Sequence, residues 1–173
     1  LRSIIPQMAN KHGNFFMRMC RRNMVKIYEE GSEFKIGKAA VLKDGEDVTI
    51  IANGIMVYEA LKAGDLLKEK GISARIVDMF TLKPIDLFCV IESAKKTGAV
   101  VTAENHNIIN GLGSAVAEVL CENFPVPLER VGVQDKFGEV GSQDYLMDRF
   151  GLRAEEICKK AVRVIERKAP AAV

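Results

Sequence analysis

The sequence predicts an α/β domain of three layers, in which helices cover both faces of a mostly parallel sheet of about five strands with one antiparallel edge strand. Two observations predict this fold class. From residue 37 onward, short segments rich in Val and Ile alternate with longer segments of helical periodicity. The 173 residues are 48% hydrophobic and 28% charged, which is the balance of one globular domain.

Five segments have the length and composition of strands, and turn-forming residues flank most of them. These are Ala39–Leu42, Val48–Ala52, Ala74–Met79, Ala99–Ala103 and Leu128–Val133. The link of residues 43–47 is too short for a parallel crossover. We therefore expect the first two strands to form an antiparallel hairpin.

Helical periodicity predicts helices between these strands. They begin near Met56, Pro84, Leu112 and Ser142, and the last one runs over Ala154–Lys168. Pro84 suits a first helical turn, because its missing N–H would have no partner there. Asp86 follows in the same turn, where a carboxylate caps a helix and favours its macrodipole.

The segment before residue 37 is expected to be separate from this domain. Residues 1–22 open with a helical pattern that Gly13 ends, and Asn14–Met19 has the composition of a buried strand. Such elements need a further sheet, so we interpret residues 1–22 as the tail of a preceding domain. Residues 23–36 are interpreted as a linker, residues 37–168 as the main domain and residues 169–173 as a frayed terminus.

The charge and cysteine patterns exclude several function classes. The 25 basic and 23 acidic residues are interleaved, which argues against a nucleic-acid partner. The four cysteines form no CxxC pair, so reduced thiols are expected rather than a metal site. No apolar run has the length of a membrane span, so we expect no membrane partner and a cytoplasmic location. The basic run Arg18–Lys26 either meets an anionic group or is solvated.

One internal stretch, Val101–Val116, has the order strand, glycine-rich turn and helix. Ligands of open α/β sheets collect at such strand ends, where Glu104 and His106 are expected to lie. If the strand continues, these two side chains point the same way and form a possible proton-transfer pair. Tight packing of the strand against the helix is by itself a sufficient explanation of both glycines, and it is the preferred one. No nucleophile elbow or carboxylate pair occurs, so the domain offers no reaction by itself.

Several motifs in this order resemble the C-terminal domain of transketolase, and the resemblance covers nearly the whole chain. The motifs are Phe34–Ala39, Asp47–Gly54, Val77–Asp86, Val101–His106, Gly111–Val116 and the region of residues 138–151. The resemblance implies the three-layer fold of that domain. Phe16–Asn23 resembles the last strand and exit of the pyrimidine-binding domain that precedes it in this family, which makes residues 1–22 the tail of that domain.

The resemblance implies a complete enzyme that transfers a two-carbon ketol unit between sugar phosphates, as in the pentose phosphate pathway. Thiamine diphosphate and a divalent cation, magnesium or calcium, would bind upstream, with the activating glutamate also upstream and neither ligand held by this segment. Arg21 matches an arginine that holds the substrate phosphate, and Arg18 is its companion. The partners implied are upstream domains or an N-terminal subunit, in a homodimer. This chain would be scaffold and dimer contact, inactive alone.

Three alternatives stay open. 1-Deoxyxylulose-5-phosphate synthases resemble this layout but place an arginine where Phe80 stands. The β subunits of 2-oxoacid dehydrogenases share the fold but lack a match to His106. Arg22 replaces a proline common in transketolases, although Tyr28 keeps their spacing from Arg21. The third alternative is a stand-alone oligomerisation or regulatory module that binds an anion at the helix start after Gly111.

Overall fold

The computed structural model of the chain describes residues 1–20 and 24–168. Its five-stranded sheet has the order β1-β3-β2-β4-β5. The strands β3, β2, β4 and β5 run parallel to one another, whereas β1 pairs with β3 in the antiparallel sense. The strands are β1 (Ala40–Lys43), β2 (Val48–Ala52), β3 (Ala74–Asp78), β4 (Val100–Asn107) and β5 (Leu128–Val133). This arrangement confirms the predicted fold class.

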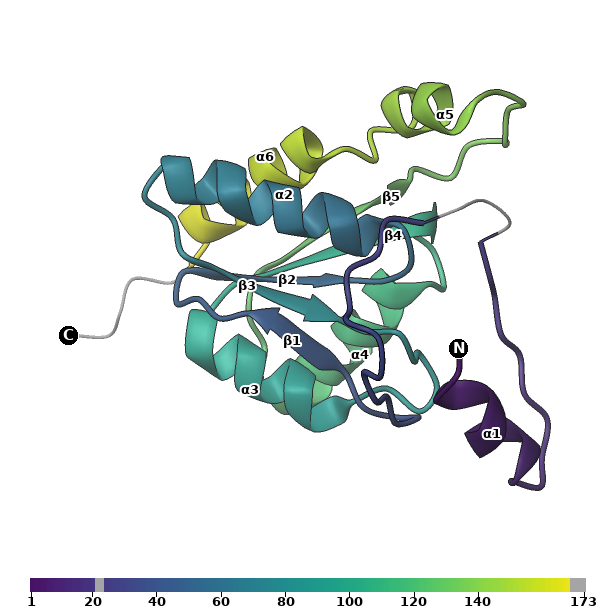
Figure 1. Cartoon of the computed structure of the whole chain (residues 1–173). Helices are drawn as coiled ribbons and strands as arrows, with labels where there is room; N and C mark the ends of the chain where they lie inside the picture. Colours follow the sequence, from purple (N-terminus) through teal and green to yellow (C-terminus); the bar gives the residue numbers. More distant parts are fainter. Residues whose placement is uncertain (21–23, 169–173) are drawn as a thin grey trace.

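Helices cover both faces of the sheet (Figure 1). One face packs against α2 (Met56–Glu69) and α6 (Ala154–Glu166), and the other packs against α3 (Leu87–Thr97) and α4 (Leu112–Asn123). Every residue of β2 is buried, with Ile50 in the first core and Ile51 in the second. The alternation of side chains along a strand thus feeds two hydrophobic cores.

The predicted hairpin between the first two strands is wrong. The strand β1 is antiparallel, as expected, but its partner is β3, which lies between β1 and β2. The link of residues 44–47 therefore passes the start of β3 instead of making a turn between neighbours. Gly45 makes this crossing possible, because a Cβ there would overlap the Ala74 carbonyl carbon and lie 2.6 Å from the Arg75 nitrogen.

The other helices begin close to their predicted positions, with one correction. Pro84 lies outside α3, and Asp86 is the N-cap rather than a first-turn residue, since its Oδ1 accepts the Cys89 N–H at 3.2 Å. Capping by Asp86 was expected, and it places the helix start after Asp86. Ser142 similarly caps α5 (Gln143–Arg149) by accepting the Tyr145 N–H. No helix within residues 1–20 and 24–168 is long and apolar enough to cross a membrane.

The N-terminal part forms a short helix, α1 (Ile4–Ala9), but not the predicted strand. Residues 14–20 have no regular structure, and the Phe16 side chain is 92% exposed. A strand needs a neighbour, and the described strands pair only among themselves. Residues 24–36, here called the strap, hold α1 through Gln7, whose Nε2 donates to the Phe34 carbonyl at 2.6 Å while its Oε1 accepts the Ile36 N–H. The predicted frayed terminus, residues 169–173, lies outside the described residues.

Candidate functional site

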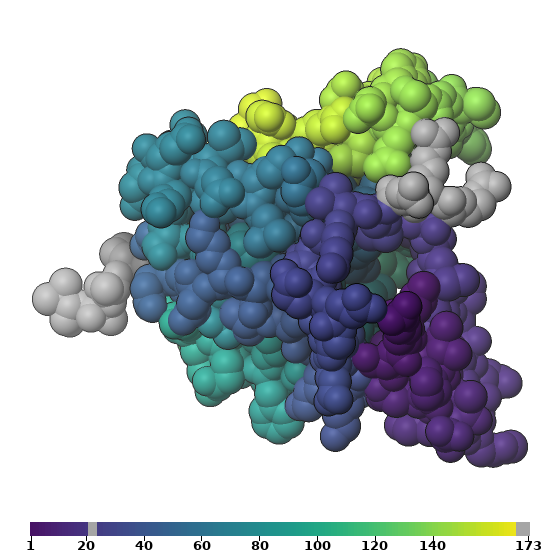
Figure 2. Space-filling view, in the orientation of Figure 1, coloured from purple at the N-terminus to yellow at the C-terminus, as the bar shows by residue number. Residues whose placement is uncertain are grey.

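The carboxyl ends of β2, β3, β4 and β5 meet at one edge of the sheet, because these strands are parallel. Open α/β sheets bind their ligands at this edge. The strap and residues 1–20 lie along the same side of the domain (Figures 1 and 2). The candidate site is therefore the region where these two segments meet the ends of β3 and β4.

Glu104 is a buried carboxylate near the end of β4, with its side chain only 2% exposed. Its Oε2 accepts the Leu112 N–H and its Oε1 accepts the Gly113 N–H, both at 2.8 Å. These N–H groups have no partner within α4, so the carboxylate satisfies the helix N-terminus and favours its dipole. Gly111 permits the contact, since a Cβ there would overlap the carboxylate. Its geometry favours a structural role for Glu104.

His106 lies on the same strand, and its side chain is 48% exposed. The strand continues to Asn107, so the two side chains do point to the same side, as the proton-transfer hypothesis requires. However, His106 Nδ1 is 3.8 Å from Glu104 Oε2 and only 2.8 Å from the Asn107 carbonyl oxygen. Both Glu104 oxygens already accept backbone N–H groups, and this geometry does not favour proton transfer between the two side chains. A role for the pair in proton transfer remains a prediction.

The two arginines predicted to hold a phosphate have different outcomes. Arg18 reaches the candidate site, where its Nη2 donates to the Asn105 carbonyl oxygen at 3.0 Å, at the end of β4. The structure therefore brings the Arg18 side chain to the backbone of Asn105, which lies between Glu104 and His106 in the sequence of β4. Arg21 and Arg22 lie outside the described residues. The phosphate-binding roles of Arg18 and Arg21 remain predictions.

A second buried carboxylate, that of Asp78, belongs to the last residue of β3. The Tyr28 hydroxyl of the strap donates to Asp78 Oδ2 at 2.7 Å. Asp78 is 7% exposed, and its Oδ1 has no hydrogen-bond partner among the described residues. Burial, together with the Asp78 contact, raises the pKa of Tyr28, and burial raises the pKa of Asp78 against the effect of the tyrosine hydrogen bond. Sequence reasoning missed this pair, whose only signal was a carboxylate at the end of an apolar strand.

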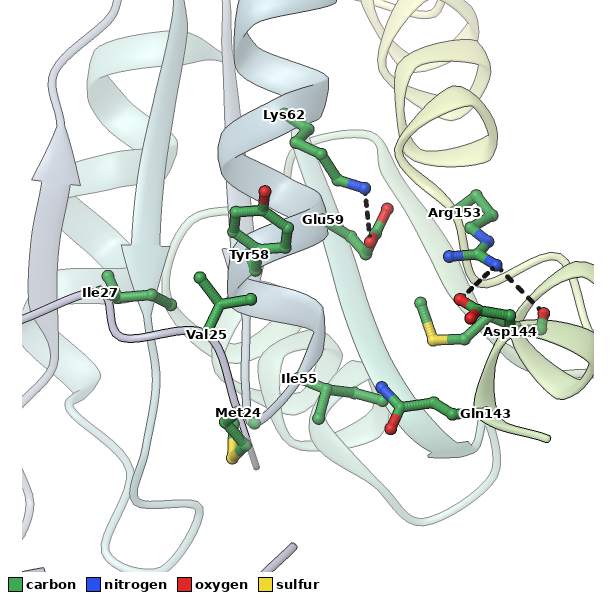
Figure 3. A pocket seen from close by; sticks show the side chains of 12 residues that line it. Met24, Val25, Ile27, Ile55, Tyr58, Glu59, Lys62, Gln143, Asp144 and Arg153 are labelled. Carbon is green, nitrogen blue, oxygen red and sulfur yellow. Dashed lines mark hydrogen bonds and ion pairs between the residues drawn. The ribbon is translucent and has the colours of Figure 1, made fainter. Parts of the chain in front are cut away.

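A cavity of about 210 Å³ lies between the strap, α2, α5 and Arg153 of the α5–α6 link (Figure 3). Its charged side chains are paired. Lys62 Nζ lies 2.7 Å from Glu59 Oε1, and Arg153 Nη2 lies 3.0 Å from Asp144 Oδ1. Glu59 Oε2 also accepts the Ala154 N–H at 2.9 Å, which caps α6 from another helix. These contacts join α2 to α5 and α6, and of the predicted site residues that the structure describes, Arg18, Glu104 and His106, none lines the cavity.

The fold and the site together define an open α/β domain. The carboxylates at its strand ends make hydrogen bonds within the domain, Glu104 to the start of α4 and Asp78 to Tyr28. The chain matches the family described as transketolase, C-terminal domain, over residues 37–157. The chain therefore belongs to the transketolase C-terminal domain family.

Three similar proteins place the chain within this family. The 6-deoxy-6-sulfo-D-fructose transketolase subunit of Clostridium sp. strain MSTE9 is 54% identical over 97% of the chain and 52% of that protein. A solved structure described as a split gene transketolase, inactive β4 tetramer, is 44% identical with a TM-score of 0.94, over 97% of the chain and 55% of that chain. A 1-deoxy-D-xylulose-5-phosphate synthase of Trichormus variabilis is 35% identical over 99% of the chain and 28% of that protein. The chain thus spans about half the length of the first two.

Membership of this family implies thiamine diphosphate in the complete enzyme, but the start of α4, the helix N-terminus at this edge of the sheet, does not fit its diphosphate group. The N–H groups of Leu112 and Gly113, which would attract a diphosphate at the start of α4, already bind Glu104. Within residues 1–20 and 24–168, no group of three or more His, Cys, Asp or Glu residues is placed to hold a metal ion. We assign no cofactor contact to these residues.

Proposed function

We propose that the chain is the C-terminal portion, or part of the C-terminal subunit, of a thiamine-diphosphate-dependent transketolase. The complete protein transfers a two-carbon ketol unit between sugar phosphates, with the cofactor chemistry located upstream. The chain contributes a scaffold and a dimer contact, and it is inactive alone. The observation that carries this proposal is the agreement over 97% of the chain with a split gene transketolase at 44% identity.

The partner in this proposal is an upstream domain or an N-terminal subunit of the same enzyme. The similar solved protein is an assembly of β chains described as inactive. This description supports the view that β chains need a further subunit for turnover. The homodimeric state, the divalent cation and the location in the cytoplasm belong to the same proposal.

The substrate of this proposal is a ketose with an anionic terminal group. A sugar phosphate was expected from the resemblance, and the relative at 54% identity is named for a sulfonated fructose. Phosphate and sulfonate are both tetrahedral anions that an arginine fork can bind. Xylulose 5-phosphate is the first donor to test, and 6-deoxy-6-sulfofructose is the second.

The alternative activity is that of 1-deoxyxylulose-5-phosphate synthase, whose members are also similar to the chain. Phe80 argues against it, because this aromatic ring takes the place of the arginine expected there. The ring packs edge-on against Phe34, with centroids 5.3 Å apart, so the position belongs to an apolar cluster. The alternative of a regulatory anion-binding module is opposed by Glu104, which occupies the helix start after Gly111.

Reconstitution with the upstream subunit or domain tests the proposal. We expect thiamine-diphosphate-dependent conversion of xylulose 5-phosphate with ribose 5-phosphate, and none by the chain alone. Pyruvate with glyceraldehyde 3-phosphate is the competing substrate pair of the synthase. Turnover of that pair, without turnover of either ketose donor, would reject the proposal. Titration of the isolated chain with inorganic phosphate tests the anion-binding module, for which we expect no binding.

Arg21→Ala in the complete enzyme tests the predicted phosphate contact. We expect weaker transition-state binding of xylulose 5-phosphate by about 1.5–3 kcal/mol, the range of a hydrogen bond to a charged group. The measurement is kcat/KM for xylulose 5-phosphate and for unphosphorylated xylulose. An equal loss for both sugars would refute the role of Arg21, because xylulose has no phosphate to lose.

A further inference from the structure

Arg18, the first residue of the basic run, and Tyr28, just after the run, are tied to the ends of different strands. Arg18 Nη2 donates to the Asn105 carbonyl oxygen at the end of β4, at 3.0 Å. The Tyr28 hydroxyl donates to Asp78 Oδ2 at the end of β3, at 2.7 Å. Since β2 lies between β3 and β4, the two contacts are on opposite sides of its carboxyl end. The chain is therefore held at two points on this edge.

The Tyr28 contact is supported by aromatic packing. The Tyr28 and Phe34 rings lie 4.6 Å apart between centroids at an angle of 85°, and Phe34 packs in the same way on Phe80. Edge-to-face pairs of this kind favour one relative orientation of the rings. Phe34 also belongs to the strap, whereas Phe80 follows β3. The cluster therefore fixes the strap to the sheet beside Asp78.

The Tyr28 hydroxyl has a defined electrostatic task as well. Asp78 is buried, and among the described residues this hydroxyl is the only side-chain donor to its carboxylate. A buried carboxylate with no donor carries a large desolvation cost. The pKa of Tyr28 is raised by burial and by Asp78, so the phenol stays protonated and keeps its donor. The contact therefore does not depend on ionisation of Tyr28 at neutral pH.

We propose that Tyr28 and Asp78 are positioning residues for substrate recognition, and that their contact fixes the strap on the sheet so that Arg18 is held where it can meet the anionic end of the ketose. This inference rests on the proposed function. It assigns to the C-terminal domain a specific part in recognition, in addition to that of a scaffold. A small displacement of a binding group is enough to weaken substrate selection, because recognition of an anion depends on geometry.

The test uses the complete enzyme with Tyr28→Phe, which removes the hydroxyl and keeps the ring. We expect KM for xylulose 5-phosphate to rise about fivefold, with kcat and the KM for unphosphorylated xylulose unchanged. Tyr145→Phe is the matched control, since its hydroxyl also donates to a carboxylate, Glu139 Oε2 at 2.8 Å, but in an exposed position. This control should leave both KM values unchanged.

The double variant Tyr28→Phe/Asp78→Leu separates positioning from stability. Tyr28→Phe alone leaves the buried Asp78 carboxylate without its donor, which costs stability. Replacing both partners by apolar groups removes that carboxylate, so stability should recover. The Tyr28–Asp78 hydrogen bond, here called the tether, remains absent. We expect KM for xylulose 5-phosphate to stay raised although the thermal stability returns to the wild-type value. A KM that recovers together with stability would overturn the inference.

Hydrogen exchange of the assembled protein gives a measurement that does not need turnover. Amides of the strap and of residues 14–20 should exchange faster in Tyr28→Phe than in wild type or Tyr145→Phe. Unchanged exchange overturns the tether, and faster exchange with an unchanged ratio of the two KM values overturns its role in recognition. Absence of ketol transfer in the wild-type complex would reject the proposed function, and the exchange measurement would still decide whether the tether exists.

Discussion

Two buried carboxylates at the same edge of the sheet differ in how well they are satisfied. Glu104 accepts two backbone N–H groups and is therefore a fixed part of the fold. Asp78 accepts one hydroxyl, and its second oxygen has no partner among the described residues. Burial of a polar group is tolerated when its hydrogen bonds are made and costs free energy when they are not. Glu104 therefore stabilises the start of α4, whereas Asp78 depends on Tyr28 for its side-chain hydrogen bond.

Glu104→Gln is expected to lower the free energy of unfolding by about 1.5–3 kcal/mol, because an amide keeps one acceptor and places an NH₂ group against a backbone N–H. The measurement is urea unfolding. His106→Ala serves as the control and should change stability little, since this side chain is half-exposed. If Glu104→Gln instead keeps its stability and abolishes turnover of the complete enzyme, the proton-transfer hypothesis is favoured over the capping role.

At the scale of elements, strand and helix positions follow from local sequence. The strands β2 and β5 have the predicted bounds, and α4 starts at the predicted residue. The Val and Ile residues of β2, the turns that flank both strands and the helical periodicity of α4 indicate these positions directly. The partner of β1 was not predictable from the sequence. The short link between β1 and β2 shows only that the two strands are not parallel neighbours. Insertion of β3 between them depends on packing between distant segments.

The candidate site was predictable only where its parts are close in sequence. Glu104 and Leu112 are eight positions apart, and their common location at a strand end was expected. Tyr28 and Asp78 are 50 positions apart, and Arg18 and Asn105 are 87 apart. No local pattern reports such contacts. The apolar composition of residues 14–19 predicted a strand wrongly for the same reason, since pairing with another strand is not a local property.

Gly45→Ala tests the crossing of the β1–β2 link over β3. The new Cβ would overlap backbone atoms of Ala74, which have no rotamer to move away. We expect a destabilisation of about 1–3 kcal/mol, the range of overpacked sites, measured by thermal or urea unfolding. Gly138→Ala is the control, because a Cβ there meets nothing within 4 Å. Equal stability of the two variants would show that the link does not press against β3.

At the scale of the whole molecule, ion pairs fasten the last helix to the edge of the sheet. Glu129 on β5 lies 3.0 Å from Lys160, 2.7 Å from Arg167 and 3.4 Å from Arg163, all on or just after α6. Burial tends to raise the pKa of Glu129, but these cations outweigh it and hold the pKa below its usual value of 4.5. Exposure of the cations moderates the energy of each pair.

Glu129→Gln should therefore reduce the loss of stability in acid. A carboxyl group with a lowered folded-state pKa contributes stability above its unfolded value, and this contribution disappears as the pH falls through the folded value. We expect the free energy of unfolding to fall less steeply below pH 4.5 in Glu129→Gln than in wild type. The exposed Glu122, which makes no ion pair among the described residues, provides the control Glu122→Gln. Wild-type steepness in Glu129→Gln would contradict the assignment.

Asp78→Asn should change the acid dependence of stability in the opposite direction to Glu129→Gln. Burial raises the pKa of Asp78, despite the lowering effect of the Tyr28 hydrogen bond, so the folded protein binds this proton before the unfolded chain does. Stability from the protonated form is fully present below the usual value of 3.8 and is lost as the pH rises through the raised value. Wild-type Asp78 therefore offsets part of the acid loss caused by Glu129. Unfolding measured from pH 3 upward should show a steeper fall of stability toward acid in Asp78→Asn, and a shallower fall would contradict the raised pKa.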